Sequence, residues 1–215
     1  MSEDFGKDSL FKHGFQFYAQ VYTPYSEIPR ADGFREAART LLNRIDPSYE
    51  IKEKNETYTR NTLVYPIAYS FRHYLELRLK AIMVELNYYV CQTPLNGMEK
   101  EIKKISDQHN LILIWKKILE LREGLSEKDN DFIFGNADLK KIENRMNELS
   151  SIDAGSFAFR YPTKKCGATS IPLELPGFDV KNFVQKLDEI SEMLEQISDN
   201  LAIAKDFLGD YLMSI

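Results

Sequence analysis

The sequence predicts an all-α protein, because apolar residues recur at helical spacing in several long segments. Glycine and proline are few, at 10 and 8 of 215 residues, which leaves room for long uninterrupted helices. Strand-like alternation is confined to one region, residues 156–178, where we expect an irregular loop or a small hairpin. Together these features predict an up-and-down bundle of four or five long helices with additional helices at the N-terminus.

The composition is that of an ordinary globular protein of one domain's size. Hydrophobic residues make up 43% of the chain and charged residues 28%, enough apolar surface to bury a core. The net charge of −5 argues against nucleic-acid binding through overall charge, although a local basic patch stays open. The acidic N-terminus is unlike a signal peptide, and no apolar run is long enough to span a membrane, so we expect a cytoplasmic protein.

Several kinds of chemistry lack their sequence motifs here. Cys91 and Cys166 are the only cysteines and are not in CxxC spacing, so neither a disulfide framework nor a structural zinc site is indicated. The chain contains no P-loop, dinucleotide-binding glycine run, GxSxG elbow or HExxH motif. We therefore expect no metal and no cofactor.

The first two helices are expected at residues 9–22 and 34–45. Pro24 ends the first, Asp32 is the candidate N-cap of the second, and Pro47 follows the second.

The polar stretch that follows, residues 45–61, reads as an exposed loop. It divides an N-terminal helical extension, residues 1–60, from a helical bundle, residues 61–215.

The central helix is expected at residues 61–88, with Pro66 near its first turns. A helical wheel places its apolar residues on two nearly opposite arcs, so two sides of this helix should be packed. The arcs consist of Phe71, Leu75, Leu79, Ile82 and Leu86 on one side, and of Tyr74, Leu77, Ala81 and Val84 on the other.

The fourth helix is expected at residues 109–122, after a loop with a short basic helical turn, and it should be largely buried. Ser106 or Asp107 is its candidate cap.

A fifth helix is expected to follow Asp138 and to end at residues 153–155. The last helix should start after Asp179, and it either continues unbroken to Tyr211 or breaks at residues 198–200.

A charged stripe runs along the central helix between the two apolar arcs. Arg72, Glu76 and Lys80 follow at i, i+4 and i+8, with His73 beside them. One interpretation is a solvated seam of ordinary i, i+4 ion pairs. The other is the wall of a groove in which Arg72 and Lys80 contact an anion while Glu76 holds Arg72 in place.

The segments "FRHYLELRLKAI", "HNLILIWKK" and "FRYP" resemble the HEPN superfamily of helical bundles. Several bacterial branches of that superfamily combine an R-x3-E-L-x-L-K helix, an H-[DN]-L helix start and an RYP segment. The resemblance covers residues 61–215. It implies a bundle, often dimeric, that binds RNA or a nucleotide, or that cleaves RNA without a metal, as in toxin or phage-defence systems.

Cleaving members of the superfamily carry an Arg followed by a His after four to six intervening residues. No Arg in this chain has a His at that spacing, and His13, His73 and His109 are the only histidines. Catalysis would therefore need an unusual set, for which the candidates are His109, Arg72 and Arg160. The resemblance also covers Glu76, Lys80 and Tyr161 without assigning them a role, and we take these three as candidate ligand-binding residues. Lys164 and Lys165, which follow Arg160 in the sequence, are added as basic candidates.

Each candidate also has a purely structural interpretation. His109 could be a residue of a helix cap, and Arg160 could form a loop salt bridge. Lys164 and Lys165 beside Arg160 could form a small basic patch together with residues 103–105. The alternative to RNA or nucleotide binding is a non-catalytic module that forms a homodimer and docks a protein partner through its aromatic N-terminal helices.

Overall fold

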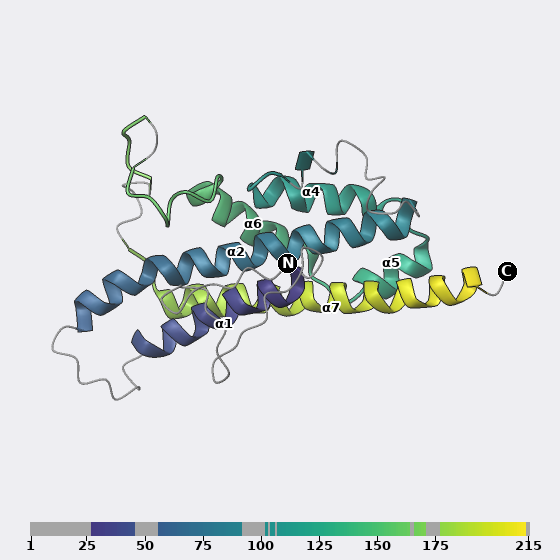
Figure 1. Ribbon diagram of the computed structural model, residues 1–215, viewed down its shortest axis with the longest axis horizontal. Helices are drawn as coiled ribbons and strands as arrows, with labels where there is room; N and C mark the ends of the chain where they lie inside the picture. Colours follow the sequence, from purple (N-terminus) through teal and green to yellow (C-terminus); the bar gives the residue numbers. More distant parts are fainter. Residues whose placement is uncertain are drawn as a thin grey trace, which may run out of the picture.

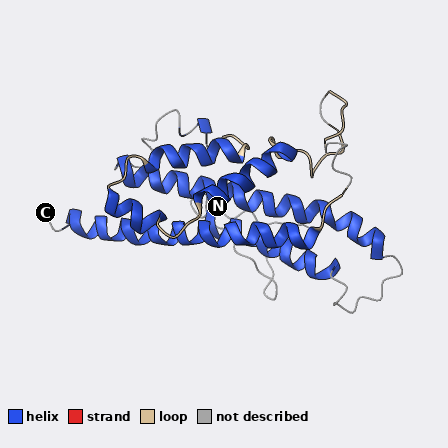
Figure 2. Cartoon of the chain, turned by 180° about the vertical axis from the view of Figure 1, so that it is seen from behind, coloured by secondary structure: helices blue, strands red, loops and turns tan. Residues whose placement is uncertain are grey.

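All regular secondary structure in the described part of the chain is helical (Figures 1 and 2), which confirms the all-α bundle. The computed structural model describes residues 27–45, 56–91, 102, 104–105, 107–163, 166–170 and 177–213. Its helices are α1 (Glu27–Ile45), α2 (Glu56–Cys91), α4 (Leu111–Arg122), α5 (Glu127–Phe134), α6 (Leu139–Asp153) and α7 (Val180–Met213). The helix predicted at residues 9–22 lies outside the described residues. No described helix is both long and apolar enough to span a membrane.

The long helix α2 lies at the centre, with α1 and α7 on one side and α4 on the other (Figure 1). Helices α2 and α7 run in the same direction, because Tyr74 contacts Glu195 and Glu85 pairs with Lys205 further along both helices. Helix α1 runs opposite to them and is fixed by ion pairs. Its buried Arg35 contacts Asp188 at 2.8 Å and Glu195 of α7.

Helix α4 runs in the same direction as α2, so the up-and-down alternation holds for α1 with α2 but not for this pair. His109, just before α4, pairs with Glu76, whereas Gly124, just after α4, lies against Val90 at the far end of α2. A Cβ atom on Gly124 would lie 2.7 Å from Cγ1 of Val90, so any larger residue here would require the Val90 side chain to move. The long connection between α2 and α4 gives the chain room to return to the middle of α2 before α4 begins.

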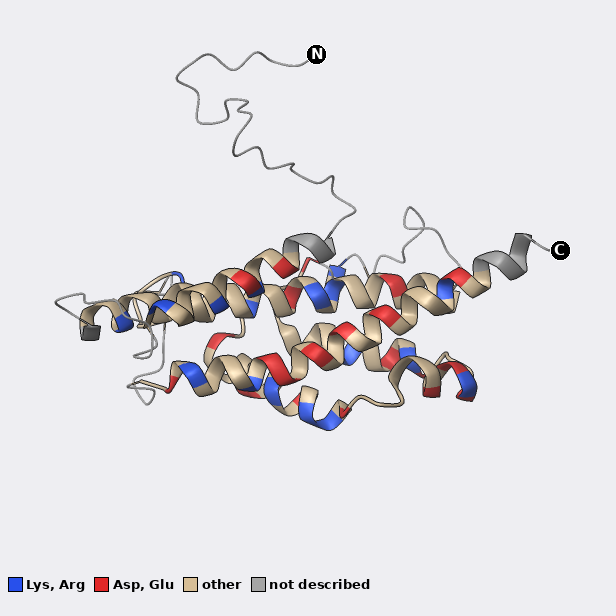
Figure 3. Cartoon of the chain, turned by 90° about the horizontal axis from the view of Figure 1, so that it is seen from below, with Lys and Arg blue, Asp and Glu red and all other residues tan. Residues whose placement is uncertain are grey.

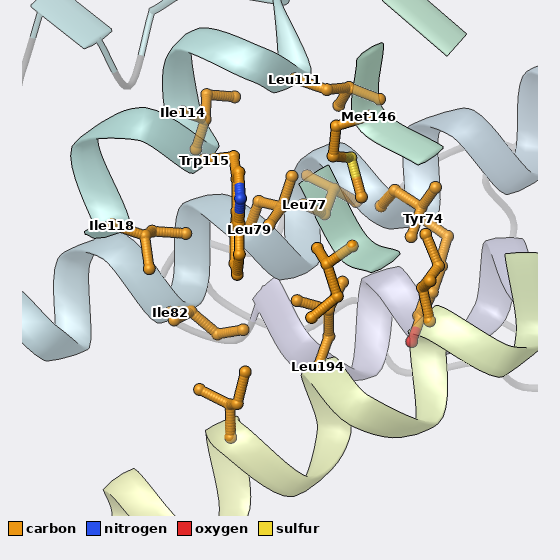
Figure 4. Packing of buried hydrophobic residues seen from close by; sticks show 14 of the residues in the cluster. Tyr74, Leu77, Leu79, Ile82, Leu111, Ile114, Trp115, Ile118, Met146 and Leu194 are labelled. Atoms are coloured by element: carbon orange, nitrogen blue, oxygen red, sulfur yellow. The ribbon is translucent and has the colours of Figure 1, made fainter. Parts of the chain in front are cut away.

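The hydrophobic core surrounds α2 on both predicted arcs. Figure 4 shows Trp115 of α4, which is fully buried, pointing into this core toward α2. Both arcs of α2 are packed as expected, although Val84 of the second arc is only half-buried. The other members have 9% exposure or less: Phe71, Leu75, Leu79, Ile82, Leu86, Tyr74, Leu77 and Ala81. Basic and acidic residues are interspersed along the helices (Figure 3).

Two predicted helix caps are wrong, and one is confirmed. Asp32 lies inside α1, which already begins at Glu27, and its carboxylate accepts a hydrogen bond from Arg78 at 2.5 Å. Helix α4 is capped by Asn110, whose side chain accepts from the amides of Ile112 and Leu113. Asp138 caps α6 as predicted, because it accepts from the amide of Lys141 at 2.9 Å.

Helix boundaries differ from the prediction where polar residues are helical. Helix α2 begins at Glu56, so it is continuous across position 60, and Pro66 lies in its interior with an exposed side chain. Helix α5 was not predicted, because its 8 residues are too few for a clear apolar pattern. Helix α7 passes residues 198–200 without a break.

The segment after α6 is irregular, as predicted. Thr163 and Thr169 form one isolated antiparallel bridge, and the amide of Ser170 donates to the carbonyl of Pro162 at 3.0 Å. Gly167 has a φ of 83°, a left-handed conformation that favours glycine. This segment therefore folds back on itself over a few residues without forming a strand.

Candidate functional site

The guanidinium group of Arg72 is fully buried and is the centre of a polar network. Its Nη1 donates to Glu76 at 2.9 Å, its Nη2 donates to the backbone carbonyl of His109, and its Nε donates to the carbonyl of Asp153 at 3.2 Å. Lys80 and the imidazole of His109 both contact the second oxygen of Glu76, at 2.9 and 2.8 Å. We call these five residues the Arg72 network.

This geometry corrects both interpretations of the charged stripe. Arg72 and Glu76 are at most 2% exposed, so they do not form a solvated seam. Glu76 does hold Arg72 in place, as the groove interpretation expected. However, each nitrogen of Arg72 already donates to an acceptor within the protein, and the residue is fully buried, so its guanidinium does not face a groove that an anion could enter. Its role is to join three helices, because a buried guanidinium must be paired.

Glu76 is ionised at neutral pH. Burial alone would raise the pKa of Glu76, but hydrogen bonds from Lys80, His109 and Arg72 outweigh burial and lower this pKa to about 2. An ionised carboxylate only accepts hydrogen bonds, so we assign the proton of the His109 ring to Nδ1. The side chain of His109 is 54% exposed, which leaves Nε2 as a proton acceptor near the surface in the neutral form.

Arg160 belongs to a second group of side chains, on the irregular segment after α6. Its guanidinium carbon lies 5.4 Å from the ring centre of Tyr69, 5.3 Å from that of Phe157 and 5.4 Å from that of Tyr161. Its Nε donates to the carbonyl of Ser156 at 2.6 Å. We call Tyr69, Phe157, Arg160 and Tyr161 the Arg160 cluster.

The Arg160 cluster and the Arg72 network are neighbours on α2. Tyr69 precedes Arg72 by one helical turn and stacks on His73 at a ring separation of 5.6 Å. Burial lowers the pKa of His73, Glu76 opposes this shift, and the charges of Arg72, Lys80 and Arg160 add to it. Asp153 links the two groups along the chain, because its Oδ1 accepts from the amides of Phe157 and Ala158 at 2.7 and 3.0 Å.

The structure therefore brings together Arg72, Glu76, Lys80 and His109, and it places Arg160 and Tyr161 in a separate, adjacent cluster. Lys164 and Lys165 lie outside the described residues. Residues 103–105, which were expected to complete a basic patch with them, are described only at positions 104 and 105. The structural interpretation of Arg160 was a loop salt bridge. Arg160 forms no such bridge with any described residue.

Sequence reasoning missed three participants: Asp153, Tyr69 and Phe157. Asp153 pairs with a residue 81 positions away, and no local pattern indicates such a pair. The run Phe157, Phe159, Arg160 and Tyr161 does carry a signal, since aromatic residues interleaved with a cation are typical of surfaces that bind single-stranded nucleic acid.

No group of three or more His, Cys, Asp or Glu that could hold a metal ion occurs among the residues that the structure describes. Cys91 and Cys166 are both free and exposed.

No model of a known family, no curated protein and no solved structure matches this chain at a significant level.

The low pKa of Glu76 predicts a loss of stability in acid. Because the pKa falls from 4.5 in the unfolded chain to about 2 in the folded protein, the contribution is complete above pH 4.5 and is lost as the pH drops toward 2. The free energy of unfolding should decrease by about 3 kcal/mol over this range. Urea unfolding at a series of pH values checks this, and a Glu76→Gln variant should lack this part of the pH dependence.

Glu189→Gln is the matched control. The pKa of Glu189 is also lowered to about 2, by Lys141 and Lys186, but this carboxylate is at the surface. Added salt should therefore remove the effect of Glu189→Gln and leave that of Glu76→Gln. An equal salt response in both variants would contradict the buried network.

Proposed function

We propose that this protein binds a ribonucleotide, either free or within single-stranded RNA, through the Arg160 cluster. The observation that carries the proposal is an exposed guanidinium held within 5.4 Å of three aromatic ring centres. Aromatic faces stack on bases of any sequence, and a neighbouring cation attracts the phosphate. A single well-placed arginine can bind a phosphate even though the net charge of the protein is −5. Such binding depends more on the local geometry than on the overall charge.

The exposure of the cluster supports a ligand-binding role over a purely structural one. Phe157 and Tyr161 are 49% and 51% exposed, although rings of this size are normally buried where they only stabilise a fold. The bond from Nε of Arg160 to Ser156 fixes the plane of the guanidinium. Its two Nη atoms have no hydrogen-bond acceptor among the described residues and can form the paired contact that a phosphate accepts.

Membership of the HEPN superfamily is part of the same proposal. It is supported by the sequence motifs and by the contacts between the segments that carry them. Arg72 and Glu76 of the first motif contact His109 of the second, and Arg160 of the third lies over Tyr69, one turn before Arg72. The cytoplasmic location and the homodimer stay predictions.

Arg160→Ala should weaken the binding of single-stranded RNA by about tenfold or more, because it removes both the phosphate contact and the support of the two exposed rings. Arg160→Lys should give an intermediate affinity, since it keeps the charge and loses the planar group. Fluorescence anisotropy with a labelled oligoribonucleotide measures both.

Lys116→Ala is the matched control for charge, because Lys116 is exposed on α4. It should stay within about twofold of the unaltered protein, which is the effect of a distant surface charge. Equal losses in Arg160→Ala and Lys116→Ala would contradict a specific site at Arg160.

RNA cleavage is a second candidate function, supported by the His109–Glu76 pair. An imidazole whose Nδ1 is held by a carboxylate and whose side chain is 54% exposed can take the proton of a 2′-hydroxyl group on Nε2 when it is neutral. If cleavage occurs, it should proceed with EDTA present, and His109→Ala should slow it by about 100-fold or more. Intact RNA after prolonged incubation with the unaltered protein would contradict cleavage. If the protein neither binds nor cleaves RNA, the non-catalytic dimerising module is favoured.

A further inference from the structure

A cavity of about 740 Å³ lies at the C-terminal end of α6, beside the Arg160 cluster. Phe157 and Tyr161, the two exposed rings of that cluster, form part of its wall. The rest of the lining comes from the end of α6 and from the folded-back segment that reaches Ser170. A cavity of this volume has the size of sites that hold a small organic molecule.

Three residues of the wall carry buried side-chain oxygens that have no hydrogen-bond partner among the described residues: Ser150, Asp153 and Ser170. Such atoms are uncommon in folded proteins, because each has lost its hydrogen bonds to water without gaining others, which costs free energy. The free oxygen of Asp153 is Oδ2, which lies 3.3 Å from Nε of Arg72 without a hydrogen bond to it. Its other oxygen is already occupied by the amides of Phe157 and Ala158.

The backbone between these residues is strained. Ser156 is buried and has a φ of 61°, a conformation that residues other than glycine rarely adopt. Strain of this kind persists only where surrounding contacts enforce it, and it concentrates at ligand sites. Here the contacts are those of Asp153 with the next turn and of Ser156 with Arg160.

We propose that this cavity binds the base of a ribonucleotide that carries an exocyclic amino group next to a ring nitrogen, as adenine and cytosine do. The inference rests on the proposed function, because it assigns the phosphate of the same ligand to Arg160. The amino group donates to Oδ2 of Asp153, and the serine hydroxyl groups, after rotation about χ1, complete the contacts to the amino group and the ring nitrogen. Phe157 and Tyr161 cover the flat ring.

The charge and hydrogen-bonding pattern of the wall support this choice of base. Asp153 only accepts hydrogen bonds, so it requires a donor on the ligand, and a hydroxyl group can serve as donor or acceptor. The two N–H groups of the amino group can donate to Oδ2 of Asp153 and to one serine hydroxyl group, and the other serine hydroxyl group can donate to the ring nitrogen. A ligand that lacks the donor would leave Oδ2 without a hydrogen bond and should be discriminated against.

Isothermal titration calorimetry with 5′-AMP and with purine riboside 5′-monophosphate tests the inference, because the two nucleotides differ only in the amino group. The intact protein should bind AMP at least tenfold more tightly. Ser150→Ala and Ser170→Ala should each weaken AMP binding about three- to tenfold. The variant of the serine that contacts the amino group should leave the analogue unchanged, whereas the variant of the serine that contacts the ring nitrogen should weaken both nucleotides. Ser151→Ala is the matched control, since this neighbouring hydroxyl already donates to the carbonyl of Glu148 at 2.7 Å.

Equal affinities for the two nucleotides, or serine variants that bind AMP like the unaltered protein, would overturn the inference. If Arg160→Ala still weakened RNA binding in that case, the proposed function would stand and only the cavity assignment would fail. If neither nucleotides nor RNA bound, both would fail. A preference for AMP over its analogue supports the inference with either source of the base, and a short oligoadenylate that binds more tightly than AMP identifies RNA as that source.

Discussion

The burial of the Arg72 charge constrains the rest of this structure. A guanidinium inside a protein is tolerated only if its donors and its charge are matched, and Arg72 finds these partners on three different segments. Glu76 belongs to the same helix, His109 immediately precedes α4, and Asp153 ends α6. The positions of α4 and α6 on α2 are therefore set by polar geometry at this end of the bundle, in addition to apolar packing.

The same network fixes the segment that follows α6. Asp153 contacts Arg72 through its carbonyl oxygen, and its Oδ1 binds two amides of the next turn. That turn presents Arg160 between Phe157 and Tyr161, against Tyr69 of α2. The two arginines thus differ in their surroundings: Arg72 is buried and joins three segments, whereas Arg160 is exposed and is the residue that we propose to contact a ligand. The buried charge of Arg72 therefore helps to position the segment that carries Arg160, through Asp153.

Much of the fold could be predicted from the sequence, and the reasons for the failures are specific. Helical spacing located the middle of α2, its two packed faces and the Arg72–Glu76–Lys80 stripe, because these depend on residues one turn apart. Periodicity cannot say what faces a stripe from another helix, so the partners Asp153 and the carbonyl of His109 were missed. The burial of the stripe depends on those partners. Cap positions also failed, since Asp107 and Asn110 have the same local propensity and only tertiary contacts choose between them.

The central claim is that Arg72 is a structural arginine and Arg160 is the one that contacts the ligand. Side-chain NMR of the arginine Nε–H groups, recorded while single-stranded RNA is added, tests it most directly. We predict that the Arg72 signal exchanges slowly with solvent and keeps its position, because its donors are buried and paired. The Arg160 signal should shift as RNA binds. A large RNA-dependent shift at Arg72 with none at Arg160 would contradict the account.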